Sequence, residues 1–146
     1  MQAKDRIVLA LDVDTPEEAL QLAEELHEYV GVFKIGMQLF NSAGPGMVKQ
    51  INELGGKVFV DLKFHDIPNT VGAAGRVMTR LNAFMFNVHA AGGKEMMQKV
   101  TADVSAEAAL LGLPKPLILA VTVLTSISQK ELRDEMFVSG LEVKDL

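Results

Sequence analysis

Apolar and polar residues alternate along the chain in blocks that predict short strands separated by helices. Five apolar runs, rich in Val, Ile, Leu and Phe, recur at nearly regular intervals. They occupy residues 6–13, 31–37, 57–63, 83–90 and 116–124. Each run is continuous and does not alternate cleanly with polar residues, which is typical of strands in a parallel sheet whose two faces are both covered.

The segments between these runs carry helix signals. Thr15, Pro16 and Glu18 stand where an N-cap, a first helical residue and a capping-box acid would stand. A similar box, Ser128 and Glu131, follows the fifth apolar run. We expect helices over 15–29, after 41–46 and ending at Gly55 and Gly56, over 69–81, over 94–111, and from 128 onward.

Strands that alternate with helices form βαβ units, so the fold class is α/β with a parallel sheet. Two architectures fit this order: an open doubly wound sheet and a (β/α)8 barrel. A dinucleotide-binding doubly wound domain would carry a G-x-G-x-x-G turn after its first strand. The turn here reads LDVDTPEEA, at residues 11–19, and has no such glycines.

Composition narrows the function classes. The 146 residues suggest a single domain, 1–146, and 49% hydrophobic residues suffice for a core. A net charge of −5 argues against a nucleic-acid partner. The absence of cysteine excludes disulfides, thiolate metal sites and cysteine nucleophiles. We find neither a run long enough to span a membrane nor a signal peptide, and we expect a cytoplasmic protein without a membrane partner.

Polar side chains stand at the carboxyl end of every predicted strand. In a (β/α)8 barrel, this end of the sheet is where the chemistry takes place. A single polar residue there would mean little, but five successive strands form a pattern that favours the barrel. The residues concerned are Asp12, Lys34, Asp61, Lys63, His89, Thr122 and Thr125.

The densest group of charges lies in DLKFHDIPNT, residues 61–70. Residues two apart in a strand share a face, so Asp61 and Lys63 should project together, toward Asp12 and Lys34 on neighbouring strands. Asp66 should lie on the loop beyond. The alternative is a structural salt-bridge network, but buried ion pairs stabilise proteins poorly. The alternating array therefore favours a catalytic role.

The three histidines carry weaker signals. His27 is expected on a helix surface, and His65 is expected to pack or hydrogen-bond on the face opposite Asp61 and Lys63. His89 fits a site-lining role and a structural hydrogen bond equally well. No H-x-x-x-H or H-E-x-x-H spacing occurs, and a lysine at the centre of the cluster would repel a cation, so we expect no metal.

Taken together, these segments resemble one family, the orotidine 5′-phosphate decarboxylases of bacterial type. The resemblance runs through the segments 10–20, 33–50, 59–71, 86–97 and 117–126, and its most specific part is D-x-K-x-x-D-I-P-N-T at 61–70. It implies a (β/α)8 barrel that works as a homodimer and converts orotidine 5′-phosphate to uridine 5′-phosphate and carbon dioxide. It also implies that no cofactor and no metal take part.

The resemblance assigns roles to four residues of the array. Lys63 matches the proton donor to the pyrimidine carbon that loses its carboxylate, and Asp61 matches the acid placed against that carboxylate. Lys34 matches the lysine that links the acids and contacts the ribose. Asp12 matches a substrate-binding acid. A sister family of sugar-phosphate decarboxylases, which binds magnesium, carries an acid at the position of Lys34.

The resemblance assigns further roles outside the array. Asp66 matches an acid that reaches across the dimer into the partner's site. Ile67 and Thr70 belong to the same crossing segment and are candidate substrate-binding residues. Thr125 matches a threonine near the pyrimidine base.

Two departures from the family pattern stand out. Asn82 and Phe84 replace residues that are usually Gly and Asp. More important, a barrel of this type needs about 200 residues or more, and the chain holds about the first five βα units. The later units carry the Arg and Gln that bind the substrate phosphate in this family. We expect the N-terminal portion of an enzyme, a half-barrel completed by a second chain, or a stand-alone domain. The alternative function is a non-catalytic half-barrel that dimerises or acts as a scaffold.

Overall fold

Five parallel strands lie side by side in the order in which the chain makes them, β1-β2-β3-β4-β5. The computed structural model describes residues 2–146. The strands are β1 Val8–Ala10, β2 Val32–Gly36, β3 Val58–Phe64, β4 Met85–His89 and β5 Leu117–Val121. A doubly wound sheet reverses its strand order at a switch point. This sheet does not, so its order is that of a barrel and excludes the doubly wound alternative.

Helices connect the strands as the pattern predicts, with one addition. They are α1 Pro16–Leu26, α2 Met37–Ala43, α3 Gly46–Glu53, α4 Pro68–Arg80, α5 Gly93–Leu111 and α6 Gln129–Asp134. Short 3-10 turns are η1 Ala3–Arg6, η2 Ala90–Gly92 and η3 Val143–Asp145. Helix α2 was missed, because Met37 was assigned to the second apolar run, whereas the strand ends at Gly36.

Both predicted capping boxes are confirmed. The Thr15 hydroxyl accepts from the Glu18 backbone N–H at 3.2 Å, and the Glu18 carboxylate accepts from the Thr15 N–H at 3.3 Å. Ser128 and Glu131 exchange the same pair of bonds at 3.2 and 2.8 Å. These bonds satisfy amide groups that a helix start leaves without partners, so the helix starts could be read from local sequence.

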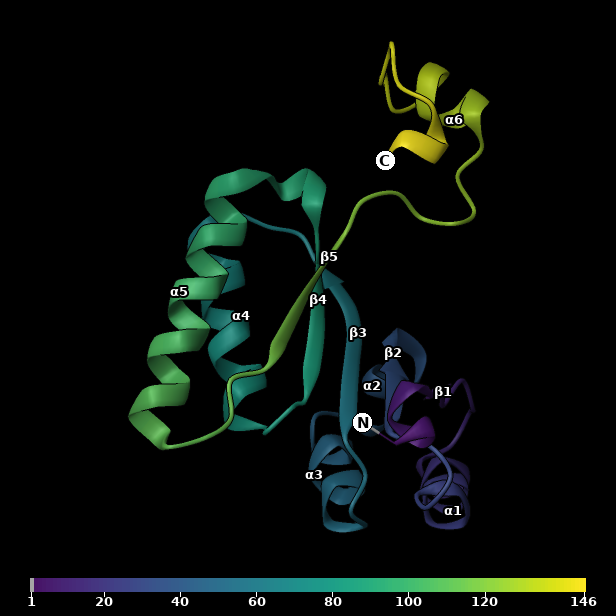
Figure 1. The fold of residues 1–146 in the computed structure, drawn as a ribbon, viewed down its shortest axis with the longest axis vertical. Helices are drawn as coiled ribbons and strands as arrows, with labels where there is room; N and C mark the ends of the chain where they lie inside the picture. Colours follow the sequence, from purple (N-terminus) through teal and green to yellow (C-terminus); the bar gives the residue numbers. More distant parts are fainter. Residues whose placement is uncertain (1) are drawn as a thin grey trace.

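The core fills one side of the sheet. Side chains from the strands that point toward the helices are fully buried and pack against residues of α1, α3, α4 and α5 in one cluster. The strand residues in that cluster include Phe33, Ile35, Val58, Val60, Phe86 and Val88. Figure 1 shows α4 and α5 packed side by side along β3 to β5.

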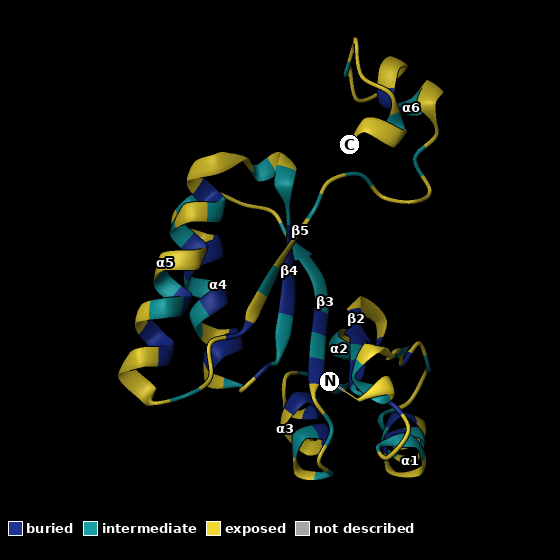
Figure 2. Ribbon diagram, in the orientation of Figure 1, coloured by how far each residue is buried: buried dark blue, intermediate teal, exposed yellow. Residues whose placement is uncertain are grey.

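The opposite side of the sheet is only partly covered, which corrects the expectation that both faces of every strand are buried. In Figure 2, β4 is mostly dark blue whereas β5, at the sheet edge, is largely exposed. Val8 on β1 is 48% exposed, and Leu117 and Leu119 on β5 are 53% and 43% exposed. The two outer strands are therefore open edges that carry apolar side chains.

The chain beyond β5 leaves the sheet. Figure 1 shows α6 and η3 grouped beyond the carboxyl ends of the strands, joined to β5 by an extended segment. In this part, Met136 and Phe137 are exposed, and Phe137 has a left-handed backbone with φ 57°. Across residues 2–146, every helix falls short of the length and apolarity that a membrane crossing requires.

Candidate active site

Three of the predicted charged residues meet at the carboxyl ends of β2 and β3. The Lys63 ammonium lies 2.7 Å from Asp61 Oδ1, and the Lys34 ammonium lies 3.5 Å from Asp61 Oδ2. Asp61 is the least exposed of the three, with 14% of its side chain accessible. Its carboxylate is thus held between two ammonium groups, as the spacing predicted.

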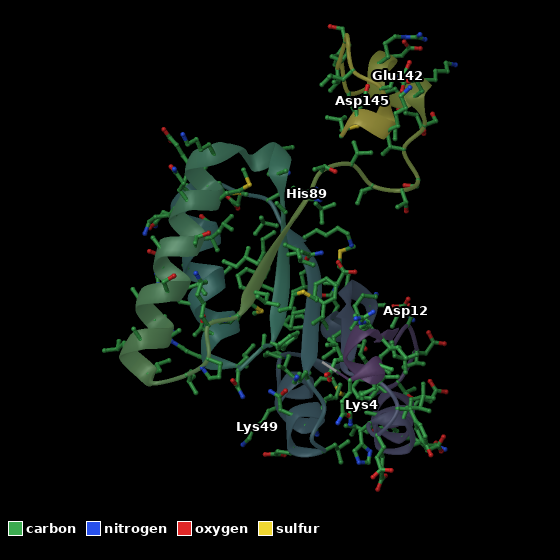
Figure 3. All side chains as sticks on the ribbon, viewed as in Figure 1. Lys4, Asp12, Lys49, His89, Glu142 and Asp145 are labelled. Carbon is green, nitrogen blue, oxygen red and sulfur yellow. The ribbon has the colours of Figure 1, made fainter. Side chains whose placement is uncertain are left out.

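Asp12 extends the array toward β1. Lys34 Nζ donates to Asp12 Oδ1 at 3.2 Å, so the order acid, base, acid, base runs from Asp12 through Lys34 and Asp61 to Lys63. Asp12 follows β1 and is the most accessible member, with 64% of its side chain exposed. In Figure 3, Asp12 lies next to β1 and β2. The array is therefore most exposed at Asp12 and most shielded at Asp61.

Asn87, in the middle of β4, completes the site and was missed from the sequence. Its side-chain NH₂ donates to Asp61 Oδ1 at 2.7 Å, and its side-chain oxygen accepts from the Lys63 backbone N–H at 2.8 Å. The residue is 3% exposed. A signal was present, since Asn87 is a lone amide within an apolar run, two positions before His89. It therefore fixes both the carboxylate and the backbone of the lysine.

The backbone at Lys63 departs from regular strand geometry. Its φ is 52°, in the left-handed region that non-glycine residues rarely adopt, and the register between β3 and β4 shifts between Val60 and Phe64. The prediction that Asp61 and Lys63 meet is confirmed, but simple alternation is not the full reason. The irregular end of β3 changes the direction of the Lys63 side chain. The left-handed backbone of Lys63 is a form of local strain that is common at functional sites.

The electrostatics of Asp61 follow from these contacts. Burial alone would raise the pKa of Asp61. Hydrogen bonds from Lys63 and Asn87, together with the positive charges of Lys63 and Lys34, outweigh burial and hold this pKa below its ordinary value. The carboxylate therefore stays charged at neutral pH even though it is shielded from water.

The segment after β3 lies beside the array but does not join it. Asp66 Oδ1 accepts from the Ile67 N–H at 2.6 Å. Ile67 is 66% exposed, and the Thr70 N–H donates to the Ile67 carbonyl as α4 begins. Thr125 is exposed on the chain that follows β5. Within residues 2–146, no ion pair or hydrogen bond links these four residues to Asp61, Lys63 or Lys34.

The histidines divide between two places. The His27 ring lies at the end of α1, with Nδ1 2.8 Å from the Glu24 carbonyl oxygen. The His65 and His89 rings lie together, 5.4 Å apart between centroids and inclined by 46°. The expectation that His65 packs against other groups is confirmed. Burial, followed by the charges of His65 and Lys63, lowers the pKa of His89.

The arrangement suits chemistry on an anion without a metal-ligand set. Lys63 can deliver a proton, and Asp61 beside it can repel a negative group placed at the same point. Among residues 2–146, no three His, Asp or Glu side chains come close enough together to hold a metal ion.

The sheet order and the charged set at its carboxyl end define part of a (β/α)8-barrel protein with its candidate site where such barrels place their chemistry. A family model described as "Orotidine 5′-phosphate decarboxylase / HUMPS family" matches residues 5–144. The chain belongs to this family.

Individual relatives agree. An orotidine 5′-phosphate decarboxylase of Syntrophomonas wolfei is 64% identical over 146 residues, which is all of this chain and 61% of the relative. One from Moorella thermoacetica is 52% identical over 93% of this chain and 54% of the relative. The crystal structure of orotidine 5′-phosphate decarboxylase from Lactobacillus acidophilus superposes with a TM-score of 0.84 at 37% identity, covering 93% of this chain and 60% of that one. The chain thus spans about three fifths of these proteins.

Proposed function

We propose that this chain carries the reacting groups of an orotidine 5′-phosphate decarboxylase, which forms uridine 5′-phosphate and carbon dioxide in pyrimidine biosynthesis. One observation carries the proposal. The Lys63 ammonium lies 2.7 Å from the Asp61 carboxylate, which Lys34 and Asn87 hold from two other strands. Residues 1–146 would then form a single domain, the N-terminal part of a barrel, and work in the cytoplasm.

The geometry suits a decarboxylation that uses no cofactor. As the bond between the pyrimidine ring and the carboxylate breaks, carbon dioxide leaves and the electron pair remains on the ring carbon. Lys63 attracts that developing charge and donates a proton to the carbon, and it regains a proton from solvent afterwards. Only interactions that are stronger in the transition state than in the ground state accelerate the step.

Asp61 contributes through its charge. Its carboxylate would lie against the carboxylate of the substrate, and this repulsion would disappear as neutral carbon dioxide departs. Because the low pKa of Asp61 keeps it ionised, the repulsion is present at neutral pH. Asp12 and Lys34 would bind the ribose on the more accessible side of the array.

The second candidate function is a half-barrel that binds other chains but does not catalyse a reaction. The open apolar edges at β1 and β5 favour it, as does the span of only 61% of the first relative. Phosphate binding in this type of barrel would come from units beyond β5. Remote binding energy contributes to the rate itself, so a chain without those units would lose turnover as well as affinity.

A chimera separates the two functions. Residues 1–121 would be fused to the part of the Syntrophomonas wolfei relative that follows its fifth strand, and the loss of orotidine 5′-phosphate followed by absorbance. We expect turnover in the chimera, and a loss of about 100-fold or more in its Lys63→Met variant. A folded chimera that turns nothing over would favour the scaffold.

We also propose that the enzyme is a homodimer in which Asp66 completes the partner's site, with Ile67 and Thr70 on the same segment and Thr125 near the base. Inactive Lys63→Ala and Asp66→Ala chimeras would be mixed and allowed to exchange subunits. Half of the dimers should then be mixed, each with one intact site, which restores about a quarter of the original activity. No recovery after confirmed exchange would show that Asp66 acts within its own subunit.

A further inference from the structure

Two imidazole rings link the loop after β3 to the loop after β4. His65 follows the last residue of β3, and His89 is the last residue of β4. Their ring centroids are 5.4 Å apart. In Figure 3, His89 lies at the same end of the sheet as the start of the segment leading to α6. The contact therefore joins the loop after β3 to the carboxyl end of β4.

The His65 ring also rests on η2. A Cβ atom added at Gly92 would lie 3.3 Å from His65 Cδ2, so the backbone there comes close to the ring. A hollow of about 520 Å³ separates the two loops and is lined by His65, Asp66, Ile67, Pro68, Ala91 and Gly92. His65, which directly precedes the segment 66–70, thus contacts both His89 and the backbone after β4.

We propose that the contact between the tilted rings of His65 and His89 holds the segment 66–70 in place, so that both histidines are positioning residues for Asp66. That Asp66 is the group to be placed rests on the proposed function. That the rings hold the segment depends only on this contact.

The contact requires that the rings are not both charged. Two imidazolium ions at this separation repel one another, and Lys63, on β3, adds a third positive charge. Asp66 is the nearest acid on the loop itself, the stretch Ala90–Gly93 carries no titratable side chain, and Lys94 and Glu95 follow at the start of α5. Burial, followed by His65 and Lys63, lowers the pKa of His89, which favours its neutral form at neutral pH.

Protonation of His89 should weaken this contact. Because the folded-state pKa of His89 lies below its unfolded value, the stabilisation is complete above the unfolded pKa. It is lost as the pH falls through the folded pKa. The segment 66–70 should therefore loosen as the pH falls below the ordinary pKa of a histidine.

Ring-nitrogen NMR on this chain tests the pairing. The chain has three histidines, and His27, on α1, serves as an internal reference. In His65→Phe, which keeps an aromatic ring without a charge, the pKa of His89 should rise while the His27 titration curve stays in place. An unchanged His89 titration in the folded variant would overturn the proposal.

Amide hydrogen exchange tests the positioning, with strand β4 as the folding control. His65→Ala should lower the protection of residues 66–70 by about 2- to 10-fold, whereas His65→Phe should restore it.

On acidification, the wild-type protection of this segment, corrected for intrinsic rates, should fall by about fourfold. His65→Phe should lack this fall. Should His65→Ala lose protection in β4 as well, the acid response of His65→Phe decides the question, and a fall equal to that of the wild type would overturn the proposal. Both measurements are independent of turnover, so they can succeed or fail separately from the decarboxylase proposal.

Discussion

At the scale of single residues, Asp61 is a shielded carboxylate with two cations and one amide as partners. Lys63 and Asn87 donate to the same oxygen, Oδ1, and Lys34 lies near the other oxygen. Such clusters stabilise a fold little, because desolvation offsets the attraction between the charges. A protein can bear this desolvation cost where the charges act on a bound group. We infer that the charges at Asp61 serve this purpose.

The first residue-scale prediction concerns Lys63→Met. Removing Lys63 takes away a hydrogen bond and a charge that lower the pKa of Asp61, so this pKa should rise. In the wild type, the lowered pKa of Asp61 stabilises the fold at pH values above the pKa that Asp61 has in the unfolded chain. This stabilisation is lost as the pH falls through the pKa of Asp61 in the folded chain. Titration of the Asp61 carboxyl carbon by NMR measures the change. Lys49→Met, at an exposed position of α3 that pairs with Glu53, should leave the pKa of Asp61 unaltered.

The second residue-scale prediction concerns Asn87→Ala. This change leaves the Lys63 N–H without its acceptor and Asp61 without one donor, in a place that water scarcely reaches. We expect a loss of about 1–3 kcal/mol in the free energy of unfolding, measured with urea. Asn41→Ala, at an exposed position of α2, should change it by less than about 0.5 kcal/mol. Equal effects of the two changes would contradict the role given to Asn87.

At the scale of elements, the most extensive contact is between α4 and α5. Gly75 faces α5, and a Cβ there would lie 2.8 Å from Val100 Cγ2 and from Val104 Cγ2. The helices are further joined by ion pairs of Arg76 with Asp103 and of Arg80 with Glu107. A small residue at Gly75 is therefore what allows the two helices to approach, and this packing fixes the position of α4, which follows the Asp66 segment.

Gly75→Ala should lower the free energy of unfolding by about 1–3 kcal/mol, because the added methyl overpacks a buried contact. Gly46→Ala is the matched control. Gly46 begins α3, and a Cβ there would meet nothing within 4 Å. That change should stabilise the chain by about 0.4–1 kcal/mol through the unfolded state. Thermal unfolding followed by circular dichroism compares the two, and a shift of the same sign in both would refute the packing explanation.

Elements whose signals lie within a few residues were predicted well. The helix over 94–111 was placed to within one residue of α5, Gly93–Leu111, and that over 69–81 differs from α4, Pro68–Arg80, by one residue at each end. Helix α2 was missed, because Gly36 and Met37 continue an apolar run and no local signal marks where strand becomes helix. The sequence therefore predicted α4 and α5 well, but it predicted neither the end of β2 nor the presence of α2.

At the scale of the whole molecule, the sheet has two open edges. The edge strand β5 exposes Leu117 and Leu119, and no strand within residues 2–146 pairs with its free side. Such an edge promotes pairing with another chain. We expect this chain to associate with itself as its concentration rises.

Leu119→Lys should weaken that association about tenfold, since burying one leucine side chain contributes at least that much. Size-exclusion chromatography with light scattering over a concentration series measures it. Leu110→Lys offers the control, because Leu110 is 80% exposed on α5, away from the sheet edge. A comparable effect of Leu110→Lys would assign the association to the helical side.

The sequence by itself determined the order of elements, the capped helix starts and the identity of the charged residues at the strand ends, because each of these depends on neighbours a few positions away. Tertiary structure alone decided that Asn87 holds Asp61 and Lys63, that Lys63 has a left-handed backbone, and that the rings of His65 and His89 meet at a tilt. Those features depend on the register between β3 and β4, including its shift after Val60. Register is set by the packing of the whole sheet against its helices, and no short segment contains it.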